Sequence, residues 1–169
     1  MEKKKFLVLD VETANDVNCP LVYDLGFAVC DKYGKIYEKQ SMLIYEVYRG
    51  ERELMNSCYY ANKIPEYEEQ IKRGETKIVR FFTAWKIIRD TMKKYNIDTI
   101  AAYNCNFDRN ALNNTIRYLT KSEYRWFFPY NTKYMCIWHM ACQVIYTQKT
   151  FPKWAKKNSF VSASGNIQT

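Results

Sequence analysis

No run of this sequence is long and apolar enough to cross a membrane. Its apolar stretches, such as residues 6–9, are the size of one strand, whereas a membrane helix needs roughly 20 apolar residues. The chain begins with a lysine-rich segment similar to the start of a signal peptide, but Asp10 and Glu12 interrupt the apolar segment that would have to follow. We therefore expect no membrane span and a cytoplasmic location.

Cys-x-x-Cys spacing is also missing, so the six cysteines do not support a cysteine-only zinc site. Several of them lie in apolar stretches, where a free thiol behaves as a small hydrophobic group. Because no secretory signal directs the chain to an oxidising compartment, we expect reduced thiols.

Acidic residues are absent from residues 124–169, which carry six lysines and arginines. A solvated basic tail and a nucleic-acid contact explain this run equally well. The net charge of +8 is compatible with a polyanionic partner.

The 169 residues are enough for one domain with its own core. Hydrophobic residues make up 47% of the chain and aromatic residues 17%, which is far from the composition of a disordered protein. We see no linker, internal repeat or second domain.

The hydrophobic pattern predicts five strands and three main helices. The predicted strands are residues 6–13, 21–30, 36–45, 99–103 and 134–137, and the predicted helices are residues 76–95, 106–119 and a segment through 140–145. A polar connection covers residues 50–75. The helix at 76–95 has an apolar stripe formed by Ile78, Phe81, Phe82, Trp85, Ile88 and Met92.

Two acidic side chains, Asp10 and Glu12, lie two residues apart at the end of the first strand. Side chains at this spacing point to the same face of a sheet. Two neighbouring carboxylates repel each other, and burying them is costly unless a cation or hydrogen-bond donors compensate. The alternative is that the strand ends at Leu9 and both acids are exposed.

A second acidic position, Asp108, follows the predicted strand 99–103 and lies in the first turn of the next helix. If that strand pairs in parallel with the first strand, both end at the same sheet edge, where sites of α/β proteins form. A favourable interaction with the helix macrodipole is another reason for an acid there. That explanation leaves Asp10 and Glu12 unexplained.

These two segments resemble two motifs of the DEDD (DnaQ-like) 3′→5′ exonucleases. Residues 9–13, Leu-Asp-Val-Glu-Thr, resemble the Asp-x-Glu-Thr motif, and residues 104–112 resemble the Asn-x-x-Phe-Asp-x-x-x-Leu motif. The resemblance implies an α/β fold, the RNase H-like three-layer sandwich with a mixed five-stranded sheet, here with its final helix missing. Residues 1–149 would form the exonuclease-like domain, and residues 150–169 an irregular C-terminal segment of it.

The resemblance also implies metal-dependent hydrolysis of phosphodiester bonds at the 3′ end of single-stranded DNA or RNA, with two Mg²⁺ or Mn²⁺ ions. Asp10 would bridge the ions, Glu12 would bind the ion that activates water, and Asp108 would bind through water. Four further residues are implied near the substrate. Thr13 and Ala14 would abut the terminal nucleotide, Asn104 would lie beside the substrate, and Phe107 would support the site from the core rather than stack on a base.

A third motif of the family is missing from this sequence. Family members carry a histidine followed five residues later by an aspartate, or a tyrosine followed four residues later by one. Here His139, the only histidine, is followed by Val144 at that distance, and Glu123 is the only acid after Asp108. We therefore expect His139 to be a structural residue.

The missing motif leaves two hypotheses. In one, the chain is a truncated and impaired exonuclease whose final helix lies beyond Thr169 in a longer protein, because a metal ligand and a general base act as a unit. In the other, it is a non-catalytic module that binds nucleic acid or a protein. A missing helix would leave apolar surface exposed, which a homodimer could cover. The composition suggests an AT-rich genome, such as that of a low-GC bacterium or its phage.

Overall fold

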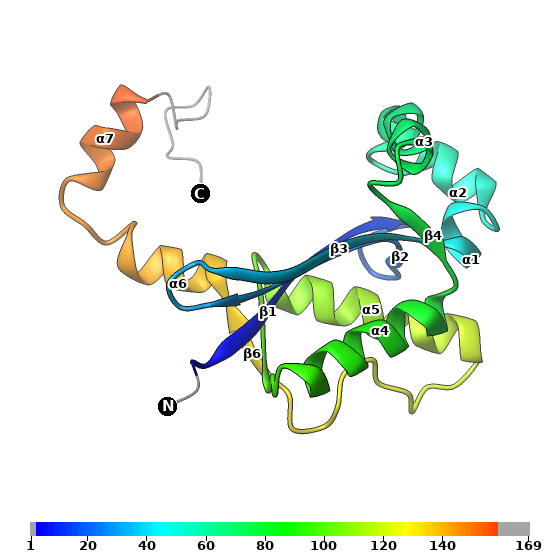
Figure 1. The fold of residues 1–169 in the computed structure, drawn as a ribbon. Coiled ribbons are helices and arrows are strands. Elements are labelled where there is room, and N and C mark those ends of the chain that lie inside the picture. The colour runs from blue at the N-terminus through cyan, green and yellow to red at the C-terminus, as the bar shows by residue number, and fades with distance from the viewer. Residues whose placement is uncertain (1–2, 159–169) are drawn as a thin grey trace.

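The computed structural model of the protein describes residues 3–158, and its central element is a mixed sheet (Figure 1). The sheet has six strands in the order β4-β3-β2-β1-β5-β6. The strands are β1 (Lys5–Ala14), β2 (Leu21–Asp31), β3 (Ile36–Ile44), β4 (Lys77–Val79), β5 (Thr99–Ala102) and β6 (Lys133–Cys136). The first three form an antiparallel meander, and the other three add in parallel at the two sides.

One face of the sheet packs on two long helices, α4 (Phe81–Lys94) and α5 (Cys105–Thr120), which lie below it in Figure 1. In β1, Leu7, Leu9 and Val11 are buried in this main core. The residues between them therefore point to the opposite face, because side chains alternate along a strand.

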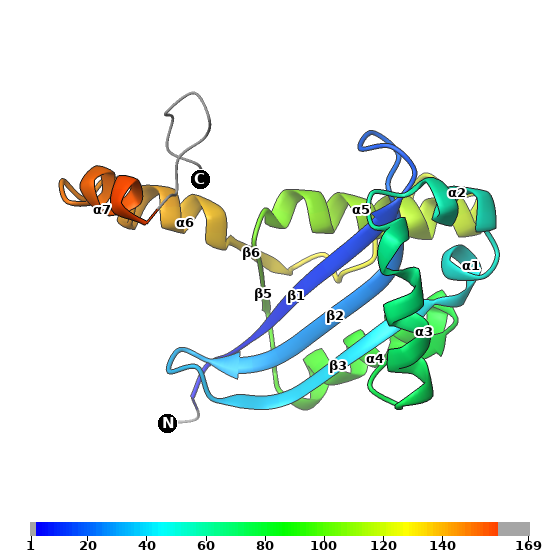
Figure 2. The ribbon, with the colours of Figure 1, turned by 90° about the horizontal axis from the view of Figure 1, so that it is seen from above.

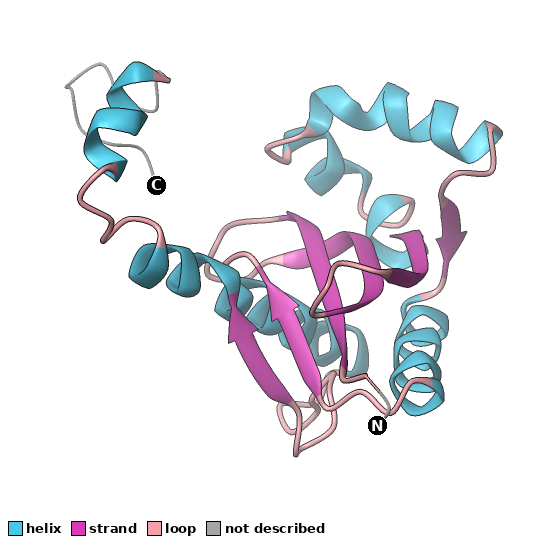
Figure 3. Cartoon of the chain, turned by 60° about the vertical axis from the view of Figure 1, so that its left-hand side comes forward, coloured by secondary structure: helices cyan, strands magenta, loops and turns pink. Residues whose placement is uncertain are grey.

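The opposite face is covered at one end by short helices, so that helices lie on both sides of the sheet (Figure 3). These are α1 (Tyr45–Tyr48), α2 (Arg52–Ser57), the 3₁₀ helix η1 (Ala61–Lys63) and α3 (Ile64–Lys72). They enclose a smaller core that includes Ala14, Tyr23 and Tyr67. Between this end and β6, the outer face of the meander stays half-exposed, for example at Val8 and Ala28.

The sheet has one strand more than predicted, because residues 77–79 are not helical. They pair in parallel with residues 42–44 of β3, and Ile78 and Val79 are β-branched residues suited to a strand. The helix begins only at Phe81, whose N–H donates to Glu46 Oε2 at 2.9 Å. The predicted stripe counted Ile78 as helical and Phe82 as buried, but Phe82 is 44% exposed.

The chain leaves the sheet edge at β6 through α6 (Ile137–Val144) and α7 (Phe151–Lys157), which extend away from the sheet (Figures 1 and 2). Residues 150–169 were predicted to be irregular, which is wrong for α7, where Pro152 occupies the first turn that proline favours. Residues 159–169 lie outside the described part. α6 covers most of the helical segment predicted through residues 140–145, and its Met140 and Val144 are exposed.

Among residues 3–158, no helix is both long and apolar enough to span a membrane. All six cysteines lie in this described part of the chain, and none forms a disulfide.

Candidate functional site

The two acids of β1 lie on the sheet face opposite the main core. Asp10 is exposed and Glu12 is half-buried. The pairing of β1 with β2 sets Asp10 opposite Gly26 and Glu12 opposite Asp24. Directly opposed residues of antiparallel strands project to the same side, so Asp24 joins the two acids.

Asp24 is a carboxylate of this cluster that the motif comparison missed. It interrupts the apolar run of β2 and is half-buried. A bulge after the Glu12–Asp24 pair shifts the register so that Thr13 pairs with Val22. A lone acid inside an apolar strand, combined with the antiparallel pairing of the first two strands, was the signal that could have revealed it.

Asp108 reaches β1 from the start of α5. The chain turns from β5 into α5 through Asn104, whose φ of 68° lies in the left-handed region that asparagine tolerates. Pairing of β1 with β5 ends at Val8, so farther along β1 no strand from residues 3–158 pairs on that side. There Val11 N–H donates to Asp108 Oδ1 at 3.2 Å, and Asp108 is only 5% exposed.

Burial destabilises the charged forms of all four carboxylates, and repulsion between them adds to this effect at Glu12, Asp24 and Asp108. Burial, and then the charge of Asp10, raise the pKa of Asp108 to about 6, against the opposing effect of the Val11 N–H. Burial followed by the charge of Asp10 also raises the pKa of Glu12. Burial is the main cause of the raised pKa values of Asp10 and Asp24. The site therefore concentrates negative charge where solvation is incomplete.

Two groups from the region of the short helices oppose this effect. The charge of Lys63, at the end of η1, lowers the pKa of Glu12 and of Asp24, and the hydroxyl of Tyr67 on α3 lowers that of Asp24. Lys63 is exposed, whereas Tyr67 is buried. The sequence pattern identified residues 50–75 only as a connection, so it gave no sign of these neighbours.

The other predicted site residues lie in different surroundings. Thr13 is half-buried and Asn104 is exposed. Ala14 has no exposed surface and packs in the smaller core, so its side chain cannot abut a nucleotide as expected. Phe107 is partly buried against the main core.

His139, which was predicted to be a structural residue, lies outside the cores of the protein. It is exposed on α6, with its ring centroid 5.4 Å from that of Trp138. α6, the first element of the arm that extends from the sheet, therefore carries His139 on the surface rather than in a core.

Magnesium and manganese are the ions whose ligand preference fits the donor atoms of the cluster, because all of these atoms are carboxylate oxygens. Within residues 3–158, however, no three His, Cys, Asp or Glu side chains lie close enough together to form a ready-made metal site. The carboxylates are thus near enough to shift one another's pKa without forming a complete ligand set.

Neither a protein-family model nor a curated protein sequence matches the chain. Solved structures do match. A product-bound structure of exonuclease I aligns with a TM-score of 0.53 and 12% identity, covering 97% of this chain and 36% of that chain. A zinc-bound complex of E. coli exonuclease I with single-stranded DNA aligns at 0.52 and 12%, covering 88% and 31%.

A structure of exonuclease I with the inhibitor BCBP aligns with a TM-score of 0.53 and 12% identity over 88% of this chain and 32% of that chain. The chain thus spans about a third of the length of exonuclease I. This likeness establishes the RNase H-like α/β fold that the sequence motifs predicted, with β1 to β3 antiparallel and the remaining pairs parallel.

Proposed function

We propose that this chain is a metal-dependent nuclease domain that hydrolyses phosphodiester bonds at the 3′ ends of single-stranded DNA or RNA. The hydrogen bond from Val11 N–H to Asp108 Oδ1 carries the proposal, because it joins acidic motifs 97 residues apart at one place in the fold. The likeness of fold to exonuclease I, solved in complex with single-stranded DNA, supports it.

Asp10, Glu12 and Asp108 would hold Mg²⁺ or Mn²⁺, and Asp24 adds negative charge beside them. A divalent cation supplies activation of water and stabilisation of charge on the phosphate oxygens. Burial raises the pKa values of all four acids, and repulsion from neighbouring carboxylates adds to this effect at Glu12, Asp24 and Asp108; a bound cation compensates for both. Since ligand groups rearrange when a metal binds, we expect the carboxylates to converge further in its presence.

The remaining residues would position the substrate. Lys63 carries a positive charge close to Glu12 and Asp24, where it can pair with a phosphate of the substrate strand. Thr13 and the exposed Asn104 would contact the terminal nucleotide, while Phe107 supports the start of α5 from the main core. Ala14 contributes only backbone, because its side chain is buried.

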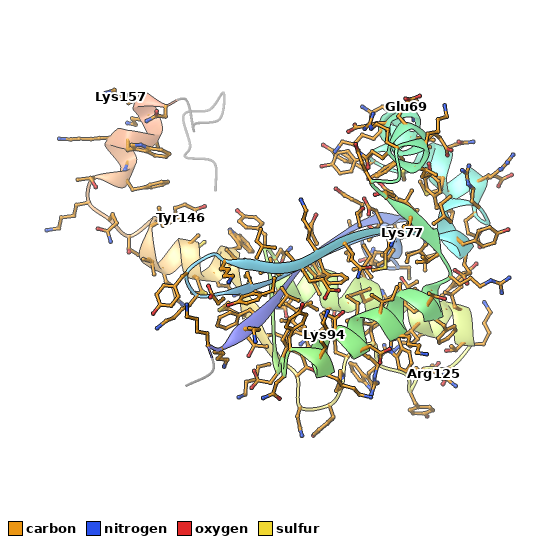
Figure 4. All side chains as sticks on the ribbon, viewed as in Figure 1. Glu69, Lys77, Lys94, Arg125, Tyr146 and Lys157 are labelled. Carbon is orange, nitrogen blue, oxygen red and sulfur yellow. The ribbon has the colours of Figure 1, made fainter. Side chains whose placement is uncertain are left out.

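The test is the shortening of a 5′-labelled single strand by the purified chain in Mg²⁺ or Mn²⁺. We expect slow, metal-dependent removal of nucleotides, since the sequence lacks the third motif and catalytic groups act as a unit. Asp10→Ala should abolish it. Glu69→Ala is the matched control, because it removes an exposed carboxylate on α3 that points away from the sheet (Figure 4).

A wild-type chain that leaves the strand intact in both metals contradicts the proposal. So does shortening that is unchanged by Asp10→Ala. RNA and DNA strands of one sequence, compared side by side, identify the sugar that the site accepts.

A non-catalytic module that binds nucleic acid or a protein is the second candidate. It is favoured by the missing third motif and by the lack of a ready-made metal site within residues 3–158. Such a module would bind a single strand with an affinity that falls as salt rises, and it would leave the strand uncut in Mg²⁺ and Mn²⁺.

A further inference from the structure

The connection between α5 and β6, residues 121–132, is fixed to the main core from inside. Phe127 is fully buried and Phe128 almost so. The N–H of Phe127 donates to Asn113 Oδ1 at 2.9 Å, and Trp85 Nε1 donates to the carbonyl oxygen of Phe127, also at 2.9 Å. These anchors define the path of the backbone, so the side chains that point outward are held in place.

The outward side chains next to these anchors are aromatic and stand beside arginines. Trp126 is 63% exposed and Tyr130 is fully exposed. The guanidinium carbon of Arg117 lies 4.7 Å from the ring centroid of Trp126, and that of Arg109 lies 5.2 Å from the ring centroid of Tyr134. We refer to Arg109, Arg117, Trp126, Tyr130 and Tyr134 as the aromatic–basic surface.

Part of this surface is hollow. A cavity of about 300 Å³ is lined by Arg109, Trp126, Phe128, Pro129, Tyr130 and Tyr134. Arg109 Nε is buried and has no hydrogen-bond partner within residues 3–158. Exposed aromatic rings beside an N–H donor that has no hydrogen-bond partner within residues 3–158 suit a ligand that combines a planar heterocycle with an anionic group.

Tyr134 of the aromatic–basic surface lies on the sheet face away from Asp10 and Glu12, although Arg109 of the same surface directly follows Asp108 on α5. Tyr134 pairs with Ile100, and Ile100 is buried in the main core on the α4–α5 side of the sheet. Asp10 and Glu12 point to the other face. In Figure 4, Arg125 of the α5–β6 connection and Glu69 of α3 lie on opposite sides of the sheet.

We propose that the aromatic–basic surface is a second nucleic-acid site, which binds a single strand by stacking bases on Trp126 and Tyr130 while Arg109 and Arg117 contact phosphates. Unpaired bases can stack on exposed aromatic rings, whereas bases inside a duplex are covered by their neighbours.

Charge favours a nucleic acid over a protein partner. Aromatic and arginine side chains also dominate protein interfaces, but from residue 109 to residue 158 Glu123 is the only acid, and the whole chain carries a charge of +8. A surface with this excess of cations attracts a polyanion and gains from the release of its counterions.

The test is binding of a fluorescein-labelled 15-nucleotide oligothymidine to the full chain in EDTA, followed by fluorescence anisotropy. Removing the metal separates this inference from the proposed hydrolysis. We expect Trp126→Ala and Tyr130→Ala each to weaken binding roughly 5- to 150-fold, the loss typical of one stacked base. Trp126→Phe should retain most of the affinity, because it keeps an aromatic face.

Tyr33→Ala is the matched control. Tyr33 is 70% exposed in the β2–β3 turn and also has lysine ammonium groups over its ring, so its loss should leave the affinity unchanged.

Equal affinities of Trp126→Ala, Tyr33→Ala and the wild type would overturn the proposal. So would equal competition by a duplex of the same length, because that result would indicate attraction by charge alone. If the wild type does not bind the single strand at all, the surface is not a nucleic-acid site. Circular dichroism of each variant establishes that the fold is intact.

Discussion

Replacing Asp108 by Asn should stabilise the metal-free protein and remove its response to magnesium. Asp108 is 5% exposed and its pKa is raised from 3.8 to about 6, chiefly by burial. Ionising Asp108 at pH 7.5 therefore costs more free energy in the folded state than in the unfolded chain. Asparagine keeps an Oδ1 acceptor for the N–H of Val11 and carries no charge.

The shift in pKa sets the size of the effect. A difference of about 2 pKa units at about 1.36 kcal/mol per unit corresponds to roughly 3 kcal/mol of unfolding free energy, as an upper value. For a chain of this size, each kcal/mol raises Tm by about 2–4 °C. Urea or thermal unfolding in EDTA at pH 7.5 measures the gain, and Glu69→Gln is the control that removes an exposed charge.

The sign of the pH dependence follows from the raised pKa. Between the unfolded value of 3.8 and the folded value of about 6, the folded state binds more protons. The contribution of Asp108 to stability is therefore fully present below pH 3.8 and is lost as the pH rises through 6. The metal-free wild type should gain stability between pH 7.5 and pH 4.5, and Asp108→Asn should lack this part of the gain.

Metal provides the second readout. A ligand that binds only the folded state stabilises it in proportion to the logarithm of its concentration, so millimolar Mg²⁺ or Mn²⁺ should raise the Tm of the wild type at pH 7.5. The same addition should have little effect on Asp108→Asn. If Asp108→Asn is no more stable than the wild type in EDTA and has the same pH dependence, the Asp108 carboxylate does not destabilise the metal-free fold.

Three further predictions concern the fold. Thr115→Val should cost about 1–3 kcal/mol in urea unfolding, because the buried Thr115 hydroxyl oxygen accepts the N–H of Val22 at the β1–β2 bulge; Thr115→Ser should cost less. Lys133→Ala should cost at most about 1 kcal/mol, since its ion pair with Asp98 is solvent-exposed. Hydrogen bonds from the Thr99 hydroxyl and then from Lys133 lower the pKa of Asp98 to about 2, so the contribution of Asp98 is present above pH 3.8 and is lost as the pH falls through 2. Self-association through apolar surface left by a missing helix stays a prediction. The exposed apolar side chains of α6 add a further surface for it, so sedimentation velocity should show association in the wild type and less of it in Val144→Glu.

The sequence predicted the main elements of the fold because their patterns are local. The two-residue spacing of Asp10 and Glu12 predicted that both acids share one face of the first strand, and Leu9 and Val11, on the other face, are buried in the main core. The motif around Asp108 located the start of α5 within one residue. These predictions depend on residues close together in the chain.

The errors arose where distant residues decide local structure. Residues 77–79 have helical spacing, but an open edge of β3 is available to them and they form a strand. Met140 and Val144 have the spacing of a packed helix, yet within residues 3–158 the tertiary arrangement leaves them exposed. The spacing of apolar residues shows which of them share one side of a helix or strand. Whether that side is buried depends on the neighbouring helices and strands that pack against it.

Local patterns of the sequence were enough to predict that Asp10 and Glu12 lie at the end of one strand and that Asp108 lies in the first turn of the helix that follows another. Only the tertiary structure brought Asp108 to the N–H of Val11, added Asp24 from the neighbouring strand, and set Lys63 and Tyr67 beside them. The physical reason is that strand register and the covering of a sheet face depend on pairing and packing between residues far apart in the chain, for which no local pattern encodes the partner.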